Sequence, residues 1–317
     1  MKRLLTILLI VAAIFVIATI GGSYYMLSYS LAPANNRTDT AACFLKLAER
    51  HPEIQPWLDS LKACRALRDT FVIMPSGERH HAYFIRQSLP HSRIAIVLHG
   101  WRNCAIDIMY IGRLYEQMGF QVLIPDLHAH GLSEGEAIGM GWNERKDVLH
   151  WLTIAARLFG GDDFVVHGVS MGAATTMNTA GEDMPECVKK IRFIEDCGYT
   201  SVWDEFSYKL KDDFGLSDFP LMYTTSLLCK LSYGWSFGEA SPLRQISKCH
   251  HPMLFIHGDN DDFVPSWMVH PLHEAKTGQK SIWITKGAAH AKSYDDYPEE
   301  YAQRIRQFVG VTCGHAE

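Results

Sequence analysis

A single serine stands between two glycines in residues 165–174, which read VVHGVSMGAA. An apolar run precedes this serine and small residues follow it, a pattern that predicts a strand turning sharply into a helix. Gly168 and Gly172 fit such a turn because a side chain at either position would collide with the neighbouring backbone. The turn would expose the hydroxyl of Ser170 beside the amino end of the helix, where free N–H groups favour a developing negative charge. These features indicate a nucleophile.

A nucleophilic serine needs a base, because its hydroxyl is a weak nucleophile on its own. The candidate is His290, which follows the last predicted strand in the segment SIWITKGAAH. The small residues before it would let this loop turn back toward Ser170. None of the other histidines has a comparable placement. We therefore predict that His290 accepts the proton of Ser170.

A third group must orient the imidazole and stabilise its charged form. The segment FIHGDNDDFVP follows the preceding strand and offers three aspartates. We assign the role to Asp261 and expect Asp259 and Asp262 to cap or solvate the turn. Asp196, at the end of the strand IRFIED, is the alternative acid because that strand ends at the same edge of the sheet.

Two backbone N–H groups are expected to bind the oxyanion that forms during attack. Met171, directly after the serine, supplies one, and Trp101, directly after LHG at the end of an early strand, supplies the other. The alternative for His99 and Gly100 is a simple turn that ends the strand. Trp101 could also line an acyl pocket.

Continuous apolar strands alternate with helical stretches from residue 93 onward. The strands read RIAIVLHG, QVLIPDL, FVVHG, IRFIED, PMLFIHG and SIWIT, and the helical stretches include 105–118, 143–158, 171–180 and 298–309. This alternation predicts an α/β fold with a mostly parallel central sheet covered by helices on both faces. Ligands bind at the carboxyl ends of such strands, where the candidate residues lie.

Other segments surround this pattern. Residues 31–68 have helical spacing and are predicted to be a helical linker, and TFVIM and HAYFIRQ flank a turn that suggests a hairpin. Residues 201–248 are rich in aromatics and contain no clear strand, so we expect a small helical cap inserted over the carboxyl edge of the sheet. The main domain is predicted to extend over residues 69–312.

The first 30 residues form a separate segment. Lys2 and Arg3 precede a long apolar run, and no further charged residue occurs before Arg37. This run is long enough to span a bilayer as a helix, with the two basic residues in the cytoplasm and the rest of the chain outside. The alternative is a cleaved signal peptide, but small-x-small cleavage sites are weak at residues 21–23 and distant at 32–34.

The overall composition excludes some classes of protein. Hydrophobic residues make up 47% of the 317, charged residues 21%, and the net charge of -5 comes without a basic block, so no nucleic-acid partner is expected. The eight cysteines show neither a Cys-x-x-Cys pair nor zinc spacing. His128 and His130 have no third ligand in register, so loop packing is expected there, with no metal and no cofactor.

The order of the motifs LHGW, DLHAHGLSEG, GVSMG, HGDNDDFVP and GAAH resembles the α/β-hydrolase superfamily from about residue 70 to 310. Within it, the chain is similar to the bacterial membrane-anchored hydrolases grouped with serine aminopeptidases, prolyl-oligopeptidase-like enzymes and cinnamoyl-type esterases. The resemblance implies Ser170 as nucleophile, Asp261 as acid, His290 as base, and Trp101 and Met171 as oxyanion donors. It also implies a cap. The His-Gly-Gly-Gly sequence of lipases is absent.

These observations predict a serine hydrolase that forms an acyl-enzyme on Ser170 from a small-molecule or peptide substrate. The triad serves both esters and amides, so the residues do not choose between them. Two alternatives stay open: a catalytically silent binding protein of the same fold, and a cofactor-free enzyme with non-hydrolytic chemistry. The predicted location is the cell membrane, with the catalytic domain outside the cytoplasm, or a secreted or periplasmic protein after cleavage.

Overall fold

The computed structural model describes residues 1–87 and 93–311. The chain divides into two compact units. The first comprises Met1–Ala32 and Ser201–Ser241, and the second comprises Pro33–Thr200 and Pro242–Glu317. The candidate nucleophile, acid and base all belong to the second unit.

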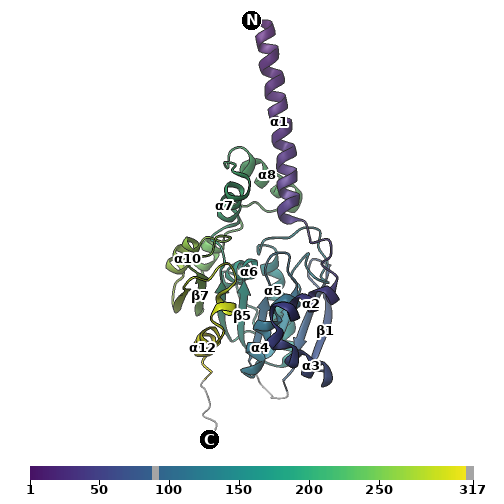
Figure 1. Ribbon diagram of the computed structural model, residues 1–317, viewed down its shortest axis with the longest axis vertical. Coiled ribbons are helices and arrows are strands. Elements are labelled where there is room, and N and C mark those ends of the chain that lie inside the picture. The colour runs from purple at the N-terminus through teal and green to yellow at the C-terminus, as the bar shows by residue number, and fades with distance from the viewer. Residues whose placement is uncertain (88–92, 312–317) are drawn as a thin grey trace. The chain divides into compact units, whose positions relative to one another are not determined.

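The second unit is built on one eight-stranded sheet in the order β1-β2-β4-β3-β5-β6-β7-β8 (Figure 1). The strands are β1 (Leu67–Ile73), β2 (Arg79–Ile85), β3 (Ile94–Leu98), β4 (Gln121–Pro125), β5 (Asp163–Val169), β6 (Lys190–Asp196), β7 (Met253–Gly258) and β8 (Lys280–Thr285). Strand β2 is antiparallel to both of its neighbours, and every other pair is parallel. The predicted mostly parallel sheet is confirmed.

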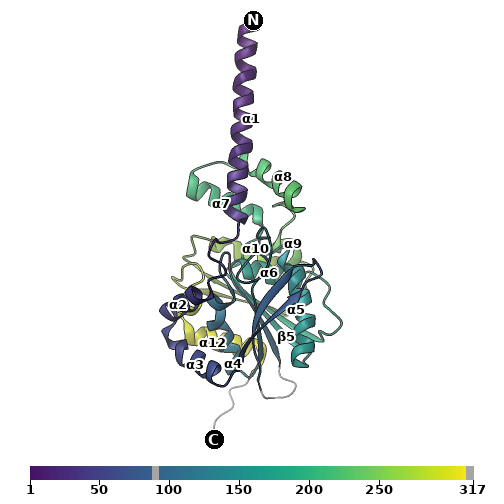
Figure 2. The ribbon, with the colours of Figure 1, turned by 90° about the vertical axis from the view of Figure 1, so that its right-hand side faces the viewer.

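Helices cover both faces of this sheet (Figure 2). One face carries α2 (Thr40–Arg50), α3 (Gln55–Ala63), α4 (Met109–Gln117) and α12 (Pro298–Val309), and the other carries α5 (Glu144–Phe159), α6 (Met171–Ala180) and α10 (Val269–Ala275). Shorter helices are η1 (Pro52–Ile54), η2 (Ala105–Ile108), α9 (Pro242–Ile246), η3 (Ser266–Met268) and α11 (Ser293–Asp296). Every residue of β3, β4 and β7 is buried, as expected for strands covered twice.

The segment expected to be a helical linker packs into the core of the second unit. Leu47 of α2, Ile54 of η1, and Leu58 and Leu61 of α3 are at most 5% exposed and join the cluster on one face of the sheet. Burying four such side chains stabilises the unit by several kcal/mol, at about 1.5–3 kcal/mol each. Residues 40–63 therefore form part of the domain that holds the candidate site.

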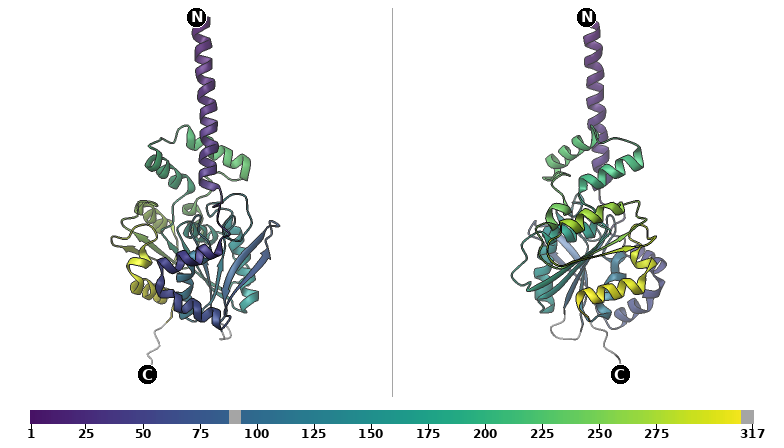
Figure 3. Two further views of the ribbon diagram at one scale, coloured as in Figure 1. Left: turned by 45° about the vertical axis from the view of Figure 1, so that its right-hand side comes forward. Right: turned by 90° about the vertical axis from the view of Figure 1, so that its left-hand side faces the viewer.

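The first unit combines α1 (Lys2–Leu31) with two helices from the predicted insertion, α7 (Val202–Phe214) and α8 (Leu221–Tyr233). The green helices of this unit lie beside the purple helix α1 (Figure 3). The hydroxyls of Ser23 and Thr224 are 2.5 Å apart. Within the described residues, α1 alone is long and apolar enough to cross a membrane, a test that a signal sequence also passes.

Candidate active site

Ser170 lies in the turn between β5 and α6, in a backbone conformation with φ 58° and ψ -119°. The tight turn explains both glycines. A Cβ on Gly168 would lie 2.0 Å from the carbonyl oxygen of Gly172, and a Cβ on Gly172 would lie 2.2 Å from that of Leu98. Because neither distance tolerates a side chain, the sequence Gly-x-Ser-x-Gly is what permits this turn.

The structure brings Ser170, His290 and Asp261 together at the carboxyl ends of β5, β7 and β8. The Nε2 of His290 lies 2.9 Å from the hydroxyl oxygen of Ser170. Its Nδ1 lies 2.8 Å from Oδ2 of Asp261. These distances fit a tautomer in which Nδ1–H donates to the carboxylate and Nε2 accepts from the hydroxyl.

Asp261 is held through both of its carboxylate oxygens. Oδ1 accepts the backbone N–H groups of Phe263, at 3.0 Å, and Val264, at 2.9 Å. Oδ2 faces His290 and also lies 3.4 Å from Nε2 of His257. Burial alone would raise the pKa of Asp261, but the contacts with the two histidines lower it to about 2. The carboxylate is therefore ionised at neutral pH.

The other aspartates considered from the sequence have different partners. Asp259 accepts the backbone N–H of Gly287 through Oδ1, at 2.5 Å, and so holds the loop that leads to the histidine. Asp196 accepts a hydrogen bond from the hydroxyl of Tyr301 at 2.8 Å. Burial raises the pKa of Asp196 to about 6. The hydrogen bond of His290 goes to Asp261.

The two predicted oxyanion donors belong to segments that adjoin the serine. Met171 is the first residue of α6, and the N–H groups of the first helical turn have no acceptor within the helix, so the N–H of Met171 is available to an oxyanion. Gly100 approaches Ser170 closely, since a Cβ on it would be 3.4 Å from the Cβ of the serine. Trp101 follows directly, and the next N–H, of Arg102, donates to Nε2 of His130 at 3.1 Å.

Solved structures share this architecture. The esterase Pf2001 of Pyrococcus furiosus superposes with a TM-score of 0.62 at 20% identity, covering 79% of this chain and 94% of that one. An acylaminoacyl peptidase of Pyrococcus horikoshii superposes with a TM-score of 0.57 at 15% identity, covering 77% of this chain and 40% of that one. The chain has the α/β-hydrolase fold.

Sequence comparison adds one relative. The uncharacterised protein YqkD of Bacillus subtilis is 27% identical over 256 residues, which is 79% of this chain and 82% of that protein. No family model matches the chain. The comparison thus extends over most of both proteins, and the reaction has to be inferred from the site itself.

A cleft of about 390 Å³ opens beside Ser170 on this α/β-hydrolase fold. Its volume suits a small molecule or a short peptide segment. The lining residues are Lys46, Arg50, His51, His99, Gly100, Trp101, Asn103, Asp107, Ile108, Tyr110, Val169, Ser170, Phe263, His290, Ala291 and Asp295. The contribution of α2 was not predicted from the sequence; its Lys46 and Arg50 are one helical turn apart and line the cleft.

His257 was likewise not predicted from the sequence as part of the site. It is fully buried near the end of β7, and its Nε2 also lies 2.9 Å from the carbonyl oxygen of Val264. Burial opposes its protonation, but the contact with Asp261 raises the pKa of His257. The available signal was a histidine directly before the Gly-Asp sequence that ends this strand.

Cys197 lies close enough to Asp261 and His290 for the three to be considered as metal ligands. Asp261 and His290 are already hydrogen-bonded to each other. Burial also raises the pKa of the Cys197 thiol well above its usual value, which keeps the thiolate from forming. This group is better suited to proton transfer than to metal binding.

Proposed function

We propose that this protein is a serine hydrolase that cleaves an ester or amide bond through an acyl-enzyme on Ser170. The observation that carries the proposal is the continuous pair of hydrogen bonds from Ser170 through His290 to Asp261. The candidate nucleophile, base and orienting acid lie within hydrogen-bonding distance of one another, with a cleft beside them. This arrangement favours a catalyst over a silent binding protein.

In the first half of the reaction, Nε2 of His290 takes the proton of Ser170 as the oxygen attacks the carbonyl carbon of the substrate. The imidazole becomes positively charged, and the ionised carboxylate of Asp261, 2.8 Å away, stabilises that charge. The carbonyl oxygen becomes an oxyanion, which the N–H groups of Met171 and Trp101 bind. His290 then gives its proton to the leaving group.

In the second half, water attacks the acyl group that is attached to Ser170. His290 takes a proton from this water, the same oxyanion donors act again, and the serine leaves with the proton returned by the imidazole. The products are a carboxylic acid and the regenerated enzyme. No redox change and no cofactor is needed for this cycle.

A panel of short acyl nitrophenyl esters and aminoacyl amides tests the proposal. Since solved structures of this fold include an esterase and a peptidase, both bond types belong in the panel. We expect hydrolysis above background for at least one type, and we expect Ser170→Ala to abolish it. Folded wild-type protein that cleaves neither type, or a Ser170→Ala variant of equal activity, would favour the silent or non-hydrolytic alternatives.

We also propose that α1 anchors the protein in the cell membrane with the catalytic unit outside the cytoplasm. The helix is 30 residues long, about 45 Å at 1.5 Å per residue, and its first 17 residues are all exposed. Exposed apolar surface of this extent is unfavourable in water and favourable in lipid. Lys2 and Arg3 at its start favour a cytoplasmic N-terminus.

A further inference from the structure

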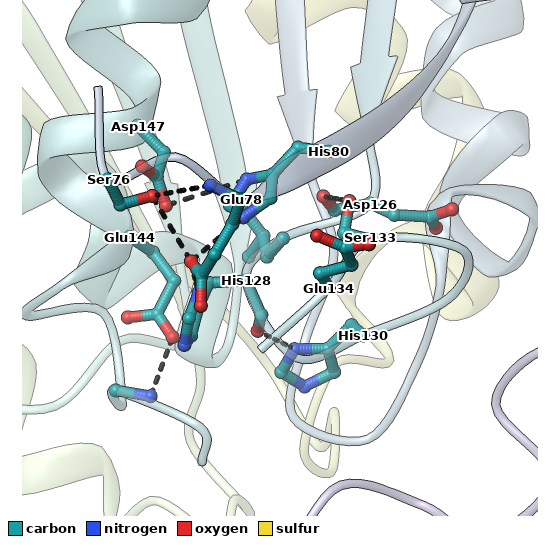
Figure 4. A network of polar contacts seen from close by, with 12 residues as sticks. Ser76, Glu78, His80, Asp126, His128, His130, Ser133, Glu134, Glu144 and Asp147 are labelled. Carbon is teal, nitrogen blue, oxygen red and sulfur yellow. Dashed lines mark hydrogen bonds and ion pairs between the residues drawn. The ribbon is translucent and has the colours of Figure 1, made fainter. Parts of the chain in front are cut away.

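A cluster of two histidines and a glutamate lies outside the triad (Figure 4). Glu78 and His80 come from the hairpin that joins β1 and β2, and His128 comes from the loop after β4. Oε2 of Glu78 lies 3.0 Å from Nδ1 of His128 and 3.5 Å from Nε2 of His80. One ligand atom from each of the three residues falls within 4.8 Å of the other two.

His80 is fully buried, yet neither of its ring nitrogens makes a hydrogen bond in the described part of the chain. Burying an imidazole without hydrogen bonds costs roughly 1–3 kcal/mol per unpaired polar group. Its Nε2 is aimed at the carboxylate of Glu78 from a distance that is long for a hydrogen bond. A ligand that Nε2 could bind directly would remove this cost.

The surroundings of the cluster also favour a cation. Oδ2 of Asp147 lies 3.7 Å from Nδ1 of His80, on the opposite side of the ring from Glu78. A carboxylate in this place can accept a hydrogen bond from Nδ1–H, which leaves the lone pair of Nε2 free to bind a metal ion. The outer carboxylates of histidine–zinc sites act in the same way. Glu144 adds a further buried carboxyl group, and its Oε2 has no partner within the described residues.

We propose that Glu78, His80 and His128 bind a divalent transition-metal ion, with Zn²⁺ as the best match. Ligand atoms at 2.0–2.1 Å from a tetrahedral zinc are about 3.3 Å from one another. The distances from Oε2 of Glu78 to the ring nitrogens of His80 and His128, 3.5 Å and 3.0 Å, are close to this value. Two imidazoles with one carboxylate favour zinc over Mg²⁺ or Ca²⁺, which prefer oxygen ligands. A water molecule would complete the coordination.

The spacing His128-x-His130 was expected to lack a third ligand, and the structure shows where each ring goes. His130 turns away: its Nδ1 lies 2.8 Å from the carbonyl oxygen of His128, and its Nε2 accepts the N–H of Arg102. The partners of His128 are supplied by the hairpin, about fifty residues earlier. Sequence spacing within one loop could not reveal this group.

The ion would tie the hairpin to a loop that supports the candidate active site. In that loop, the N–H of Leu127 donates to Nε2 of His99 at 3.0 Å, and His130 holds Arg102 beside Trp101. Metal binding would thus stabilise the loop next to an oxyanion donor. The role is structural, because the triad is complete without it.

The test is a Zn²⁺ titration of the full-length protein in detergent after removal of metals with EDTA. We expect one strongly bound Zn²⁺ per chain and a rise in Tm that Mg²⁺ does not produce. Glu78→Gln and His128→Asn should each weaken zinc binding at least about tenfold and remove the rise in Tm. Asp147→Asn should weaken binding by about 10–100-fold through His80.

Glu136→Gln is the matched control, because Glu136 is exposed and lies in the same loop region. Its zinc affinity should equal that of the wild type. Glu78 is partly exposed, so its substitution by glutamine leaves the core intact and keeps the test valid if the buried His80 tolerates no change. A wild type whose Tm does not respond to Zn²⁺, or a response retained in both ligand variants, would overturn the proposal.

A second, independent observation concerns one face of α8 in the first unit. Tyr223, Leu227 and Leu231 of α8 are spaced four residues apart and are 58%, 58% and 74% exposed, and Phe219, two residues before the helix begins, is 72% exposed. Residues at this spacing lie on the same side of a helix. The result is a continuous apolar stripe along α8.

Helix α8, which carries this stripe, packs against α1 near residues 22 and 23 of α1. Thr224 contacts Ser23, and Leu221 packs against Gly22. A hydrocarbon layer of about 30 Å spans about 20 residues of helix, so a span that starts after Arg3 ends near Ser23. Helix α8 would therefore lie at the outer surface of the bilayer.

We infer that the stripe on α8 inserts into the outer surface of the lipid bilayer, an inference that rests on the proposed anchor. Full-length protein in phosphatidylcholine–phosphatidylglycerol vesicles, with the photo-crosslinking residue benzoylphenylalanine in place of Leu227, should form lipid adducts detectable by mass spectrometry. Benzoylphenylalanine in place of Asp212, an exposed acidic position on α7, should give at least several-fold fewer lipid adducts.

Benzoylphenylalanine in place of Ile14 tests the membrane anchor separately from the contact between the α8 stripe and the bilayer surface. Lipid adducts at position 14 but none at position 227 would overturn the surface contact and leave the anchor standing. No adducts at either position would contradict both.

Discussion

The carboxylate of Asp261 is held through both of its oxygens, since backbone N–H groups bind one and histidines face the other. Its low pKa, about 2, means that it stays charged while His290 gains a proton. The stabilisation that this ionised carboxylate gives the fold is present above its ordinary pKa of 3.8. It is lost as the pH falls through about 2.

We expect Asp261→Asn to lower kcat by about a thousand- to ten-thousand-fold while KM changes little. The amide cannot stabilise a charged imidazole, and it favours the wrong tautomer of His290. Steady-state kinetics on the best ester substrate would measure the effect. Asp259→Asn is the matched control, and comparable losses in both variants would show that the loop, rather than the charge, was disturbed.

Glu195, a buried residue of strand β6, allows the effect of burial on the pKa of a carboxyl group to be tested through the pH dependence of stability. Burial raises its pKa from 4.5 to about 8. The folded state therefore keeps a proton that the unfolded chain releases above about pH 4.5, so wild-type stability falls between pH 4.5 and 8. Glu195→Gln has no such proton and its amide oxygen can still accept the N–H of Gly198.

Chemical denaturation at pH 5 and pH 9 would measure this difference. We expect Glu195→Gln to gain stability relative to the wild type at pH 9, by a shift of the order of a few kcal/mol. A stability difference between the two proteins that does not change with pH would contradict the assignment of a raised pKa to Glu195.

At the scale of elements, the turn between β5 and α6 predicts that replacing a helical glycine by alanine lowers the stability of the protein, where such a replacement ordinarily raises it. A glycine inside a helix is ordinarily improved by alanine, which adds about 0.5–1 kcal/mol of stability. Gly172→Ala would instead press its Cβ against the carbonyl oxygen of Leu98, at 2.2 Å. We expect a loss above about 2 kcal/mol in urea denaturation.

Gly238→Ala is the control for this substitution, because no atom of the described residues other than its two chain neighbours lies within 4 Å of the added Cβ. Its stability should stay within about 0.5 kcal/mol of the wild type. If Gly172→Ala were equally well tolerated, the tight turn that presents Ser170 would be wrongly described.

The order of strands and loops made most of the candidate site predictable from the sequence. Ser170, Asp261 and His290 each follow a continuous apolar strand, and parallel strands end at one edge of a sheet. His257 was missed because a histidine inside such a strand looks like any core residue. The contribution of α2 was missed because its amphipathic pattern predicts burial of one face without saying against which partner.

At the scale of the whole molecule, the proposed location of the protein depends on whether α1 stays in the membrane or is cleaved off. We expect the full-length protein to stay with the membrane fraction during extraction with alkaline carbonate, because about 20 apolar residues span the bilayer. Protease added outside should digest the catalytic unit. Release by carbonate, together with a mass that lacks the first residues, would favour the cleaved signal peptide.

The most direct measurement is the intact mass of the protein after treatment with a fluorophosphonate, followed by peptide mapping of the adduct. We expect one adduct per chain on Ser170, no adduct in Ser170→Ala, and labelling at least about a hundredfold slower in His290→Ala. An unlabelled folded wild type, or an adduct on another residue at the same rate in all three proteins, would contradict the assignment of Ser170 as the nucleophile.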